Sequence, residues 1–207
     1  MIKAILFDMD GVLIEARDWH YEALNKALAL FGYNINYSDH ITNFDGLPTS
    51  AKLKKLTVER ALPEALHSFI NEMKQQYTIE YIFKYCRPCF IHEYALSSLK
   101  SHGYKMACCS NSIRKTMDLM LSYSKLEQYL DLMLSNQDVA KSKPDPEIYL
   151  SAMNKLEVSP NECLIVEDNE NGVKAAIASG AYLLKVQNTN EVTYNNIMQQ
   201  INLVQGM

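Results

Sequence analysis

Short hydrophobic runs alternate with more polar stretches along the chain. The first run, Ile2–Phe7, is too short for a helix and ends abruptly at Asp8-Met9-Asp10-Gly11. A continuous apolar run of this length, followed by turn residues, is typical of a buried parallel strand and the loop after it. Four later runs have the same character, and we predict a strand in each: Tyr104–Cys109, Leu130–Leu134, Glu162–Val166 and Ala181–Val186.

Helical periodicity separates the later runs. Ile148, Ala152 and Leu156 have the i, i+4 spacing of one helix face. Residues 175–177 precede Gly180, which we expect to cap the end of another helix. Strands that alternate with helices predict an α/β fold, with a doubly wound, Rossmann-like parallel sheet.

Residues 15–85 break this alternation, because their apolar positions follow helical spacing throughout. We predict an all-helical cap domain over 15–85, inserted after the first strand, and a discontinuous core domain formed by 1–14 and 86–207. Ligands of open α/β sheets bind beyond the carboxyl ends of the strands, so a cap inserted there would act as a lid. The positions that indicate these helices are Ala23, Leu24, Ala27, Leu28 and Phe31 in one stripe, and Leu53, Leu56, Leu62, Leu66 and Phe69 in others.

The composition narrows the class of protein. With 207 residues and 48% hydrophobic composition, the chain can bury one core and still build a small second domain. The net charge of -4 argues against non-specific nucleic-acid binding, so an anionic substrate must be attracted by local cations or a metal. No apolar stretch approaches the ~20 residues that span a bilayer, and we find no signal peptide. We expect a cytoplasmic monomer with no membrane partner.

The five cysteines point to no disulfide framework, since their number is odd. Cys86 and Cys89 have the CxxC spacing of redox sites, but a thioredoxin-like context and a second pair for zinc are both missing. Ordinary thiols are the favoured interpretation, and a redox role for this pair stays open.

Asp8 and Asp10 are the sharpest chemical signal. Two carboxylates this close at the end of a buried strand are costly unless they share a cation or a proton. A solvated Asx turn before Gly11 is the structural alternative. The two aspartates alone do not decide between these interpretations, so the downstream polar segments matter.

Three later segments could complete a site at the same sheet edge. Ser110-Asn111-Ser112 follows a predicted strand, where hydroxyl and backbone N–H groups can hold phosphate oxygens or simply cap the next helix. Lys143 precedes a proline and therefore lies on an extended loop, from which it could reach a site as a point charge. Glu167-Asp168 ends another strand and complements Asp8 for binding a hard cation.

Taken in order, these four segments resemble the haloacid dehalogenase (HAD) superfamily. Residues 8–13, Asp-Met-Asp-Gly-Val-Leu, match its first motif, DxDGxL, and Ser110 matches the second. Lys143 matches the third, and Glu167-Asp168 the fourth. Asn169 replaces the serine that usually follows. The resemblance covers nearly the whole chain and implies the HAD fold.

The resemblance also implies a role for each matched residue. Asp8 would attack phosphorus to form an aspartyl phosphate, and Asp10 would act as general acid and base. That second role needs a raised pKa, which we expect crowding against Asp8 to supply. Mg²⁺ would be held by Asp8, Asp168 and the backbone carbonyl of Asp10, with Glu167 acting through a water. Ser110 and Lys143 would stabilise the transferring phosphoryl oxygens.

The place of the cap resembles the first HAD subclass, which includes phosphoglycolate phosphatase, sugar-phosphate phosphatases and β-phosphoglucomutase. His20 lies where relatives place a histidine near the hinge, although a structural histidine fits equally well. The mutases carry an arginine about three residues after the cap-loop glycine, Gly46, and Thr49 stands there in this chain. Lys52 is nearby, but could be solvated on a helix face. Together with Asn111, these four residues are our predicted substrate contacts.

We therefore predict a Mg²⁺-dependent phosphatase that hydrolyses a small phosphorylated metabolite, such as a sugar phosphate. A β-phosphoglucomutase-like phosphomutase is the alternative, and the missing arginine disfavours it. A non-catalytic binding protein on a HAD scaffold would be expected to have lost a catalytic residue. A dehalogenase would not need Asp10.

Overall fold

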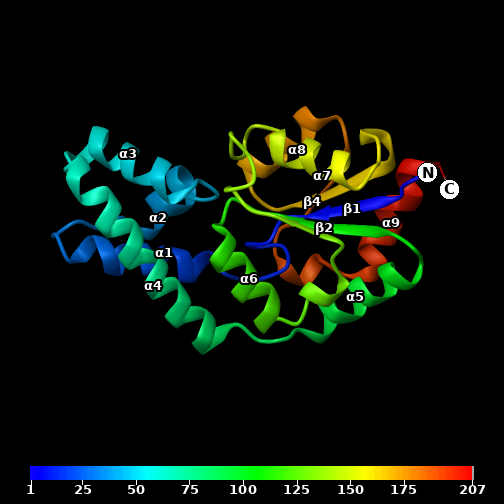
Figure 1. The fold of residues 1–207 in the computed structure, drawn as a ribbon, viewed down its shortest axis with the longest axis horizontal. Helices are drawn as coiled ribbons and strands as arrows, with labels where there is room; N and C mark the ends of the chain where they lie inside the picture. Colours follow the sequence, from blue (N-terminus) through cyan, green and yellow to red (C-terminus); the bar gives the residue numbers. More distant parts are fainter. Residues whose placement is uncertain (207) are drawn as a thin grey trace.

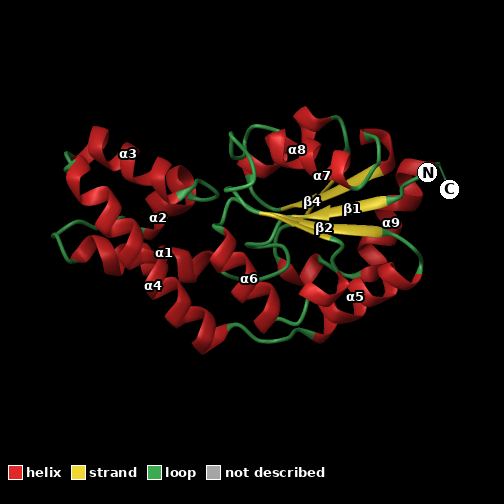
Figure 2. Ribbon diagram, in the orientation of Figure 1, coloured by secondary structure: helices red, strands yellow, loops and turns green. Residues whose placement is uncertain are grey.

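A single parallel sheet forms the centre of the molecule. The computed structural model describes residues 1–206 and has a five-stranded parallel sheet in the order β3-β2-β1-β4-β5 (Figure 2). Each predicted hydrophobic run overlaps one strand, so all five strand predictions are confirmed. The strands are β1 (Ala4–Phe7), β2 (Lys105–Cys109), β3 (Leu132–Leu134), β4 (Cys163–Glu167) and β5 (Tyr182–Lys185).

Helices cover both faces of the sheet, as the doubly wound prediction requires (Figure 1). One face packs against α5 (Phe90–Ser101), α6 (Arg114–Tyr123) and α9 (Tyr194–Gln205). The other packs against α7 (Glu147–Lys155) and α8 (Glu170–Ser179). Gly180 ends α8 in the left-handed conformation with φ 78°, which confirms it as the cap of that helix.

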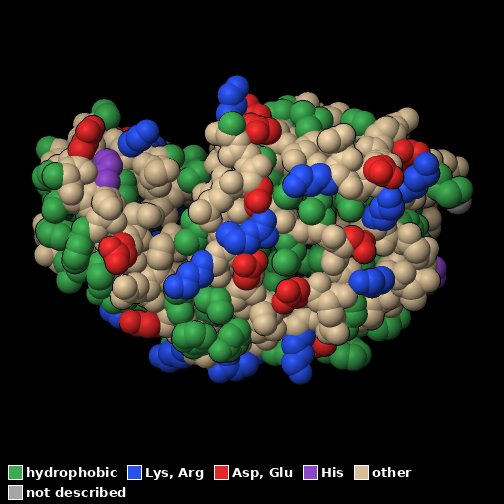
Figure 3. Space-filling model, viewed as in Figure 1, with side chains coloured by type: hydrophobic (Ala, Val, Ile, Leu, Met, Phe, Trp, Pro, Cys, Tyr) green, Lys and Arg blue, Asp and Glu red, His purple; other side chains and the backbone are tan. Residues whose placement is uncertain are grey.

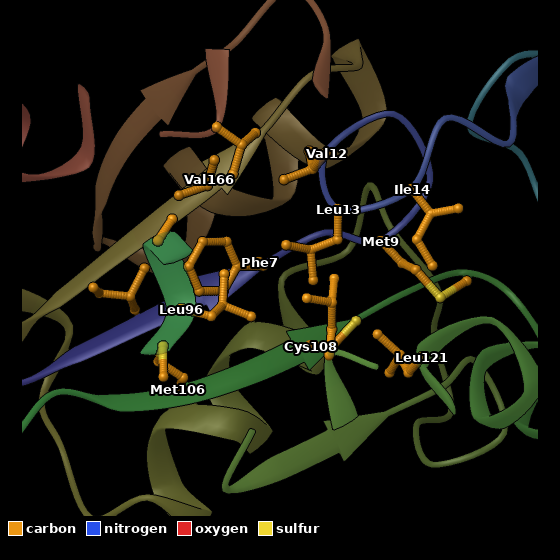
Figure 4. Close-up of a cluster of buried hydrophobic side chains, with 14 of the residues drawn as sticks. Phe7, Met9, Val12, Leu13, Ile14, Leu96, Met106, Cys108, Leu121 and Val166 are labelled. Atoms are coloured by element: carbon orange, nitrogen blue, oxygen red, sulfur yellow. The ribbon is translucent and has the colours of Figure 1, made fainter. Parts of the chain in front are cut away.

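The side chains of the strands alternate between two hydrophobic clusters. Phe7, Cys108 and Val166 point to the α5–α6–α9 side, where Figure 4 shows Phe7 near Leu96. Neighbouring strand residues, such as Leu6, belong to the α7–α8 cluster. Because β1 is buried on both faces, its whole sequence is apolar, and the chain leaves the sheet only at Asp8.

The strand order places a switch point beside β1. The chain runs from β1 outward through β2 and β3, and it later returns on the other side of β1 to form β4 and β5. Phe7 lies opposite both Cys108 and Val166, and the backbone N–H of Asp8 donates to the carbonyl of Val166 over 3.0 Å. Loops diverge at such a point and leave a crevice, so Asp8 lies at the expected ligand position.

Residues 15–85 contain helices and no strand in the described chain, and Figure 1 shows α1–α4 as a separate group beyond the sheet edge. This group has its own hydrophobic cluster, which includes Leu24, Phe44 and Leu56. We propose these residues as the cap domain. Its elements are α1 (Arg17–Ala29), α2 (Tyr37–Asp39), a π-helical turn (His40–Phe44), α3 (Thr49–Arg60), a 3-10 turn (Glu64–Leu66) and α4 (His67–Tyr85).

Two details of the cap differ from the predicted helix stripes. Phe31 and Phe69 are exposed and contact each other edge to face, outside the cluster. Leu62 is buried but lies in a loop, because Ala61 ends α3 in the left-handed conformation. Short 3-10 turns complete the core at Glu127–Tyr129, Pro160–Glu162 and Thr189–Glu191.

The described part of the chain has no helix that is both long and apolar enough to cross a bilayer. On the face seen in Figure 3, lysines and arginines are interspersed with acidic side chains, so that face carries no basic stripe among the described residues.

Candidate active site

Four loops from the core meet the cap around one cavity. Asp8 and Asp10 follow β1, Ser110 and Asn111 follow β2, and Lys143 lies on the loop after β3. The remaining predicted residues that line the cavity are His20, Gly46, Thr49, Lys52 and Asp168. Glu167 lies just beneath, fully buried. The sequence-predicted residues thus gather at one place, although they are up to 160 positions apart.

Lys143 is held between two buried carboxylates. Its Nζ donates to Asp8 Oδ1 over 2.6 Å and to Glu167 Oε1 over 2.6 Å. Although burial favours the neutral amine, the two carboxylates raise the pKa of Lys143. Burial likewise raises the pKa of Asp8, against the attraction of Lys143. Tyr149 donates its hydroxyl to Glu167 over 2.5 Å and so fixes the far end of this chain of contacts.

Asp10 is held by polar groups from both domains. His20 Nε2 lies 2.9 Å from Asp10 Oδ1, and Ser112 donates to Asp10 Oδ2 over 2.9 Å. Lys74 Nζ lies 3.1 Å from His20 Nδ1. An ammonium group can only donate, so Nδ1 accepts and the Nε2 proton points at Asp10.

The pKa expected for Asp10 was wrong in direction. Burial favours the neutral acid, but the attraction and hydrogen bond of His20, the hydrogen bond of Ser112 and the attraction of Lys74 outweigh it. The pKa of Asp10 is therefore lowered, and the group is held as an anion. Burial and Lys74 lower the pKa of His20 in turn, although Asp10 opposes them.

Three carboxylates form a group that could hold a cation. One oxygen each from Asp8, Glu167 and Asp168 lie within 4.8 Å of one another. Burial and the charge of Glu167 raise the pKa of Asp168 to about 6, as expected for acids crowded together. Hard oxygen ligands in this number suit Mg²⁺, and its charge would relieve the repulsion between them. The donor set therefore fits the predicted metal.

Gly11 and Gly46 allow close approaches that a side chain would block. A Cβ on Gly11, which has φ 91°, would lie 2.1 Å from Asp168 Oδ2. A Cβ on Gly46, which has φ 70°, would lie 2.6 Å from Asn169 Oδ1. Gly11 therefore lets the loop after β1 approach the Asp168 carboxylate after β4. Gly46 lets the cap loop approach the core at Asn169.

The cap loop is docked on the core by amide hydrogen bonds. Asn111 donates to the carbonyl of Gly46 over 3.0 Å and to the carbonyl of Lys143 over 3.2 Å. Asn171 donates to the carbonyl of Asp45 over 3.3 Å. Asn111 lines the cavity, and its amide also positions the loop above the site and the backbone of Lys143.

Lys52 is buried, so the alternative of a solvated helix face does not apply to it. Lys54, two residues later on the same helix, is exposed. Lys74, which no sequence motif singles out, also lines the cavity. Its signal was present: Lys74 continues an i, i+4 series of buried positions with Ile70, Thr78 and Ile82. A lysine in a buried stripe is unusual and marks a polar cavity or a partner.

Arg17 was also missed, and it links the cap loop to the carboxylate group. Its Nη2 donates to Asp168 Oδ2 over 2.9 Å, and its Nε lies 3.2 Å from Asp45 Oδ2. No motif surrounds Arg17, and the contact depends on how α1 begins beside β4. Sequence reasoning therefore had no signal for it.

Comparison with known proteins agrees with this geometry. Residues 5–186 match the family described as haloacid dehalogenase-like hydrolase. The chain belongs to this family. This HAD hydrolase is 29% identical over 179 residues to the phosphoglycolate phosphatase of Aquifex aeolicus, which covers 86% of the chain and 82% of the relative. It is 30% identical over 182 residues to the phosphorylated carbohydrates phosphatase of Thermotoga maritima, with the same shares covered.

A solved structure shows the same fold. The β-phosphoglucomutase of Clostridium difficile matches this HAD hydrolase with a TM-score of 0.86 and 22% identity, and each chain is covered completely. At this identity the likeness shows the fold alone. The predicted family, the α/β fold with its parallel sheet and the enzyme class, a HAD-family phosphatase, are all confirmed.

Proposed function

We propose that the protein is a Mg²⁺-dependent phosphatase that hydrolyses a small organic phosphomonoester through an aspartyl-phosphate intermediate at Asp8. The observation that carries this proposal is the buried pair of Asp8 and Lys143 beside Asp168, at the floor of a cavity roofed by the cap. A carboxylate held in place by a cation, next to a group of metal-type ligands, suits attack on a phosphoryl group.

The first half of the reaction would transfer the phosphoryl group to the enzyme. The carboxylate of Asp8 forms a bond to phosphorus while the bond to the leaving oxygen breaks. Ser110 and Lys143 would contact the phosphoryl oxygens, whose charge they stabilise. Mg²⁺, held by Asp8, Asp168 and the carbonyl of Asp10, would offset the repulsion between nucleophile and phosphate. Glu167 would keep Lys143 oriented and support the metal through a water.

Asp10 would handle the protons of both halves. It gives a proton to the leaving oxygen and then takes one from the water that attacks phosphorus, as the bond to Asp8 breaks and phosphate departs. As an anion, Asp10 is ready for the second task. For the first it must take up a proton from solvent, and the Nε2–H of His20, 2.9 Å away, would hold its carboxyl group in place.

The cap would exclude water and contact the leaving group. Gly46, Thr49 and Lys52 line the cap side of the cavity, and Asn111 holds the loop closed from the core side. Closure of this kind assembles a site and separates it from bulk water. The substrate would be a small phosphorylated metabolite. We retain the expectation of a cytoplasmic monomer as part of this proposal.

The test is phosphate release from a panel of phosphorylated metabolites with Mg²⁺ present. We expect turnover of at least one member, and loss of that turnover on addition of EDTA. Asp8→Asn should abolish release, because an amide does not attack phosphorus. If purified Asp8→Asn keeps its activity, the nucleophile assignment is wrong. A phosphomutase would instead need a bisphosphate primer and would produce an isomer without free phosphate.

A further inference from the structure

Tyr149 is a large side chain that is completely buried beneath the candidate active site, with 0% of its surface exposed. It lies in the first turn of α7, on the buried face of that helix, which packs against the sheet. A phenylalanine would fill nearly the same space without a polar atom. The hydroxyl therefore needs an explanation, because a buried hydroxyl is costly unless it is hydrogen-bonded.

The partner of this hydroxyl is Glu167. Tyr149 donates to Glu167 Oε1 over 2.5 Å, which is typical of a strong bond between a hydroxyl and a charged carboxylate. The same oxygen accepts from Lys143 Nζ over 2.6 Å, so both of its lone pairs are used. Oε2 has longer contacts, 3.2 Å to the backbone N–H of Asp168 and 3.5 Å to Asn169 Nδ2. Oε1 thus serves Lys143 and Tyr149, and Oε2 is the oxygen left to support a metal through a water.

Tyr149 also contacts Lys143 directly. Lys143 Nζ lies 4.8 Å from the centroid of the Tyr149 ring, within the distance at which a cation is attracted to the ring face. An ammonium group has three hydrogens, and two of them go to Asp8 and Glu167. Within residues 1–206 no further acceptor bonds to this group, and Lys143 lines the cavity. The ring and the two carboxylates therefore surround the ammonium group and leave one hydrogen for a ligand.

We infer that Tyr149 is a positioning residue, which acts through Glu167 to hold Lys143 where it meets the transferring phosphoryl group. This inference rests on the function proposed above, in which Lys143 stabilises the charge on the phosphoryl oxygens. Such stabilisation requires that the N–H donor point at the place where charge develops. A small displacement of Nζ would then lower the rate although the charge remains. Tyr149 does not line the cavity, so its removal should affect the rate of transfer and spare substrate binding.

The kinetic test is Tyr149→Phe, which keeps the ring and removes only the hydroxyl. We expect kcat for phosphate release to fall about 5- to 30-fold while KM stays within about twofold, because the lost alignment matters in the transition state. Tyr33→Phe is the matched control, since the Tyr33 hydroxyl donates to the carbonyl of Ala61 over 3.2 Å within the cap. It removes one hydrogen bond as well and should leave both constants unchanged.

Inhibition by vanadate and by inorganic phosphate separates positioning from packing. Vanadate imitates the five-coordinate transition state of phosphoryl transfer, whereas phosphate imitates only the ground state. In Tyr149→Phe the inhibition constant for vanadate should rise by about the factor by which kcat falls, and that for phosphate should stay within about twofold. A tyrosine that only packs would lower the melting temperature and leave the ratio of the two constants unchanged.

Nuclear magnetic resonance tests the placement of Lys143 without any turnover. The ammonium group of Lys143 should give a slowly exchanging ¹H–¹⁵N signal, identified by its loss in Lys143→Arg. Exchange of this signal with water should be at least about fivefold faster in Tyr149→Phe and unchanged in Tyr33→Phe.

The outcomes distinguish this inference from the proposed function. A kcat of Tyr149→Phe within about twofold of the native value, or an equal loss of affinity for vanadate and phosphate, would overturn the positioning role. If the native protein releases no phosphate from any ester, the phosphatase proposal fails instead. Faster exchange of the Lys143 signal in Tyr149→Phe would in that case still support the placement of Lys143 by Tyr149.

Discussion

Lys143 in the core and Lys52 in the cap are equally deep in the protein, yet their surroundings are opposite. Lys143 is enclosed by two carboxylates, and its pKa is raised although burial alone would lower it. Lys52 makes no hydrogen bond or ion pair within residues 1–206, and burial lowers its pKa to about 8 although Asp45 and Asp10 oppose the shift. Lys143 is thus paired with acids of the chain, whereas Lys52 is only near them. A buried lysine is stabilised where carboxylates lie within hydrogen-bonding distance and is costly where they do not.

We expect the greatest loss of activity when the core lysine, Lys143, is removed. Lys143→Met should reduce phosphate release by at least about 10³-fold, because it removes the cation beside the nucleophile. It should also lower the free energy of unfolding by about 3–5 kcal/mol, since Asp8 and Glu167 would be left buried and uncompensated. Urea denaturation and a phosphate assay measure the two effects.

Lys141→Met is the control for that loop, because the Lys141 side chain is 73% exposed and should tolerate the change. An unchanged unfolding free energy in Lys143→Met would mean that the acids are not held as anions by this lysine.

Removal of Lys52 should change the free energy of unfolding in the opposite direction. Lys52→Met should increase the free energy of unfolding by about 2–3 kcal/mol at pH 7. The pH dependence follows from its pKa, which falls from 10.5 to about 8 on folding. Between these values the unfolded chain binds more protons, so the stability of the native protein rises with pH there.

The advantage of Lys52→Met should therefore be full below pH 8 and disappear above about pH 10.5. Other charged groups act on Lys52 or lie near it: Asp45, Asp10, Lys74 and His40. Because these groups titrate in both proteins, the quantity to compare is the difference in unfolding free energy between the native protein and Lys52→Met at each pH. Urea melts at a series of pH values measure it. A difference that does not change with pH would show that the ammonium charge is not the cause.

The positions of several site residues could be predicted from the sequence, but their electrostatic surroundings could not. Asp8 and Asp168 could be predicted because each follows a hydrophobic strand, and parallel strands bring their carboxyl ends together. Lys143 was predicted from the proline that follows it and from the resemblance to the third motif. The pKa shifts of the buried acids and lysines could not be predicted from the sequence, because they depend on contacts between distant segments. The lowered pKa of Asp10 comes from His20 on α1 and Ser112 after β2. The positions of these two residues in the sequence do not reveal that their side chains contact Asp10. In the cap, Lys52 and Lys54 look alike in sequence, and only the packing of α3 buries one of them.

Contact between the two regions can be tested at Gly46. Gly46→Ala should lower kcat/KM about tenfold, because its Cβ would lie 2.6 Å from Asn169 Oδ1 and push the cap loop off the core. Gly32→Ala is the matched control, since Gly32 also has a positive φ, 76°, but its Cβ would meet nothing within 4 Å. Both variants should lose about 1–2 kcal/mol of stability from backbone strain. Equal activity in the two would mean that this contact does not matter for closure.

The smallest expected effect concerns Arg17, which bridges the two regions. Its Nη2 lies 2.9 Å from Asp168 Oδ2, on a carboxylate that we propose as a Mg²⁺ ligand. Two cations compete for one carboxylate, so Arg17→Gln should tighten Mg²⁺ binding by about 3- to 10-fold, in keeping with the modest energy of a partly exposed ion pair. The dependence of melting temperature on Mg²⁺ concentration measures this without any substrate.

Arg114→Gln serves as the control, since Arg114 pairs with Asp118 and Asp138 instead of any residue predicted to bind the metal. Weaker Mg²⁺ binding in Arg17→Gln would show that Arg17 orients Asp168 for the metal. Tighter Mg²⁺ binding would instead mean that Arg17 and the metal compete for Asp168, so that the arginine keeps only its contact with Asp45 once the metal is bound.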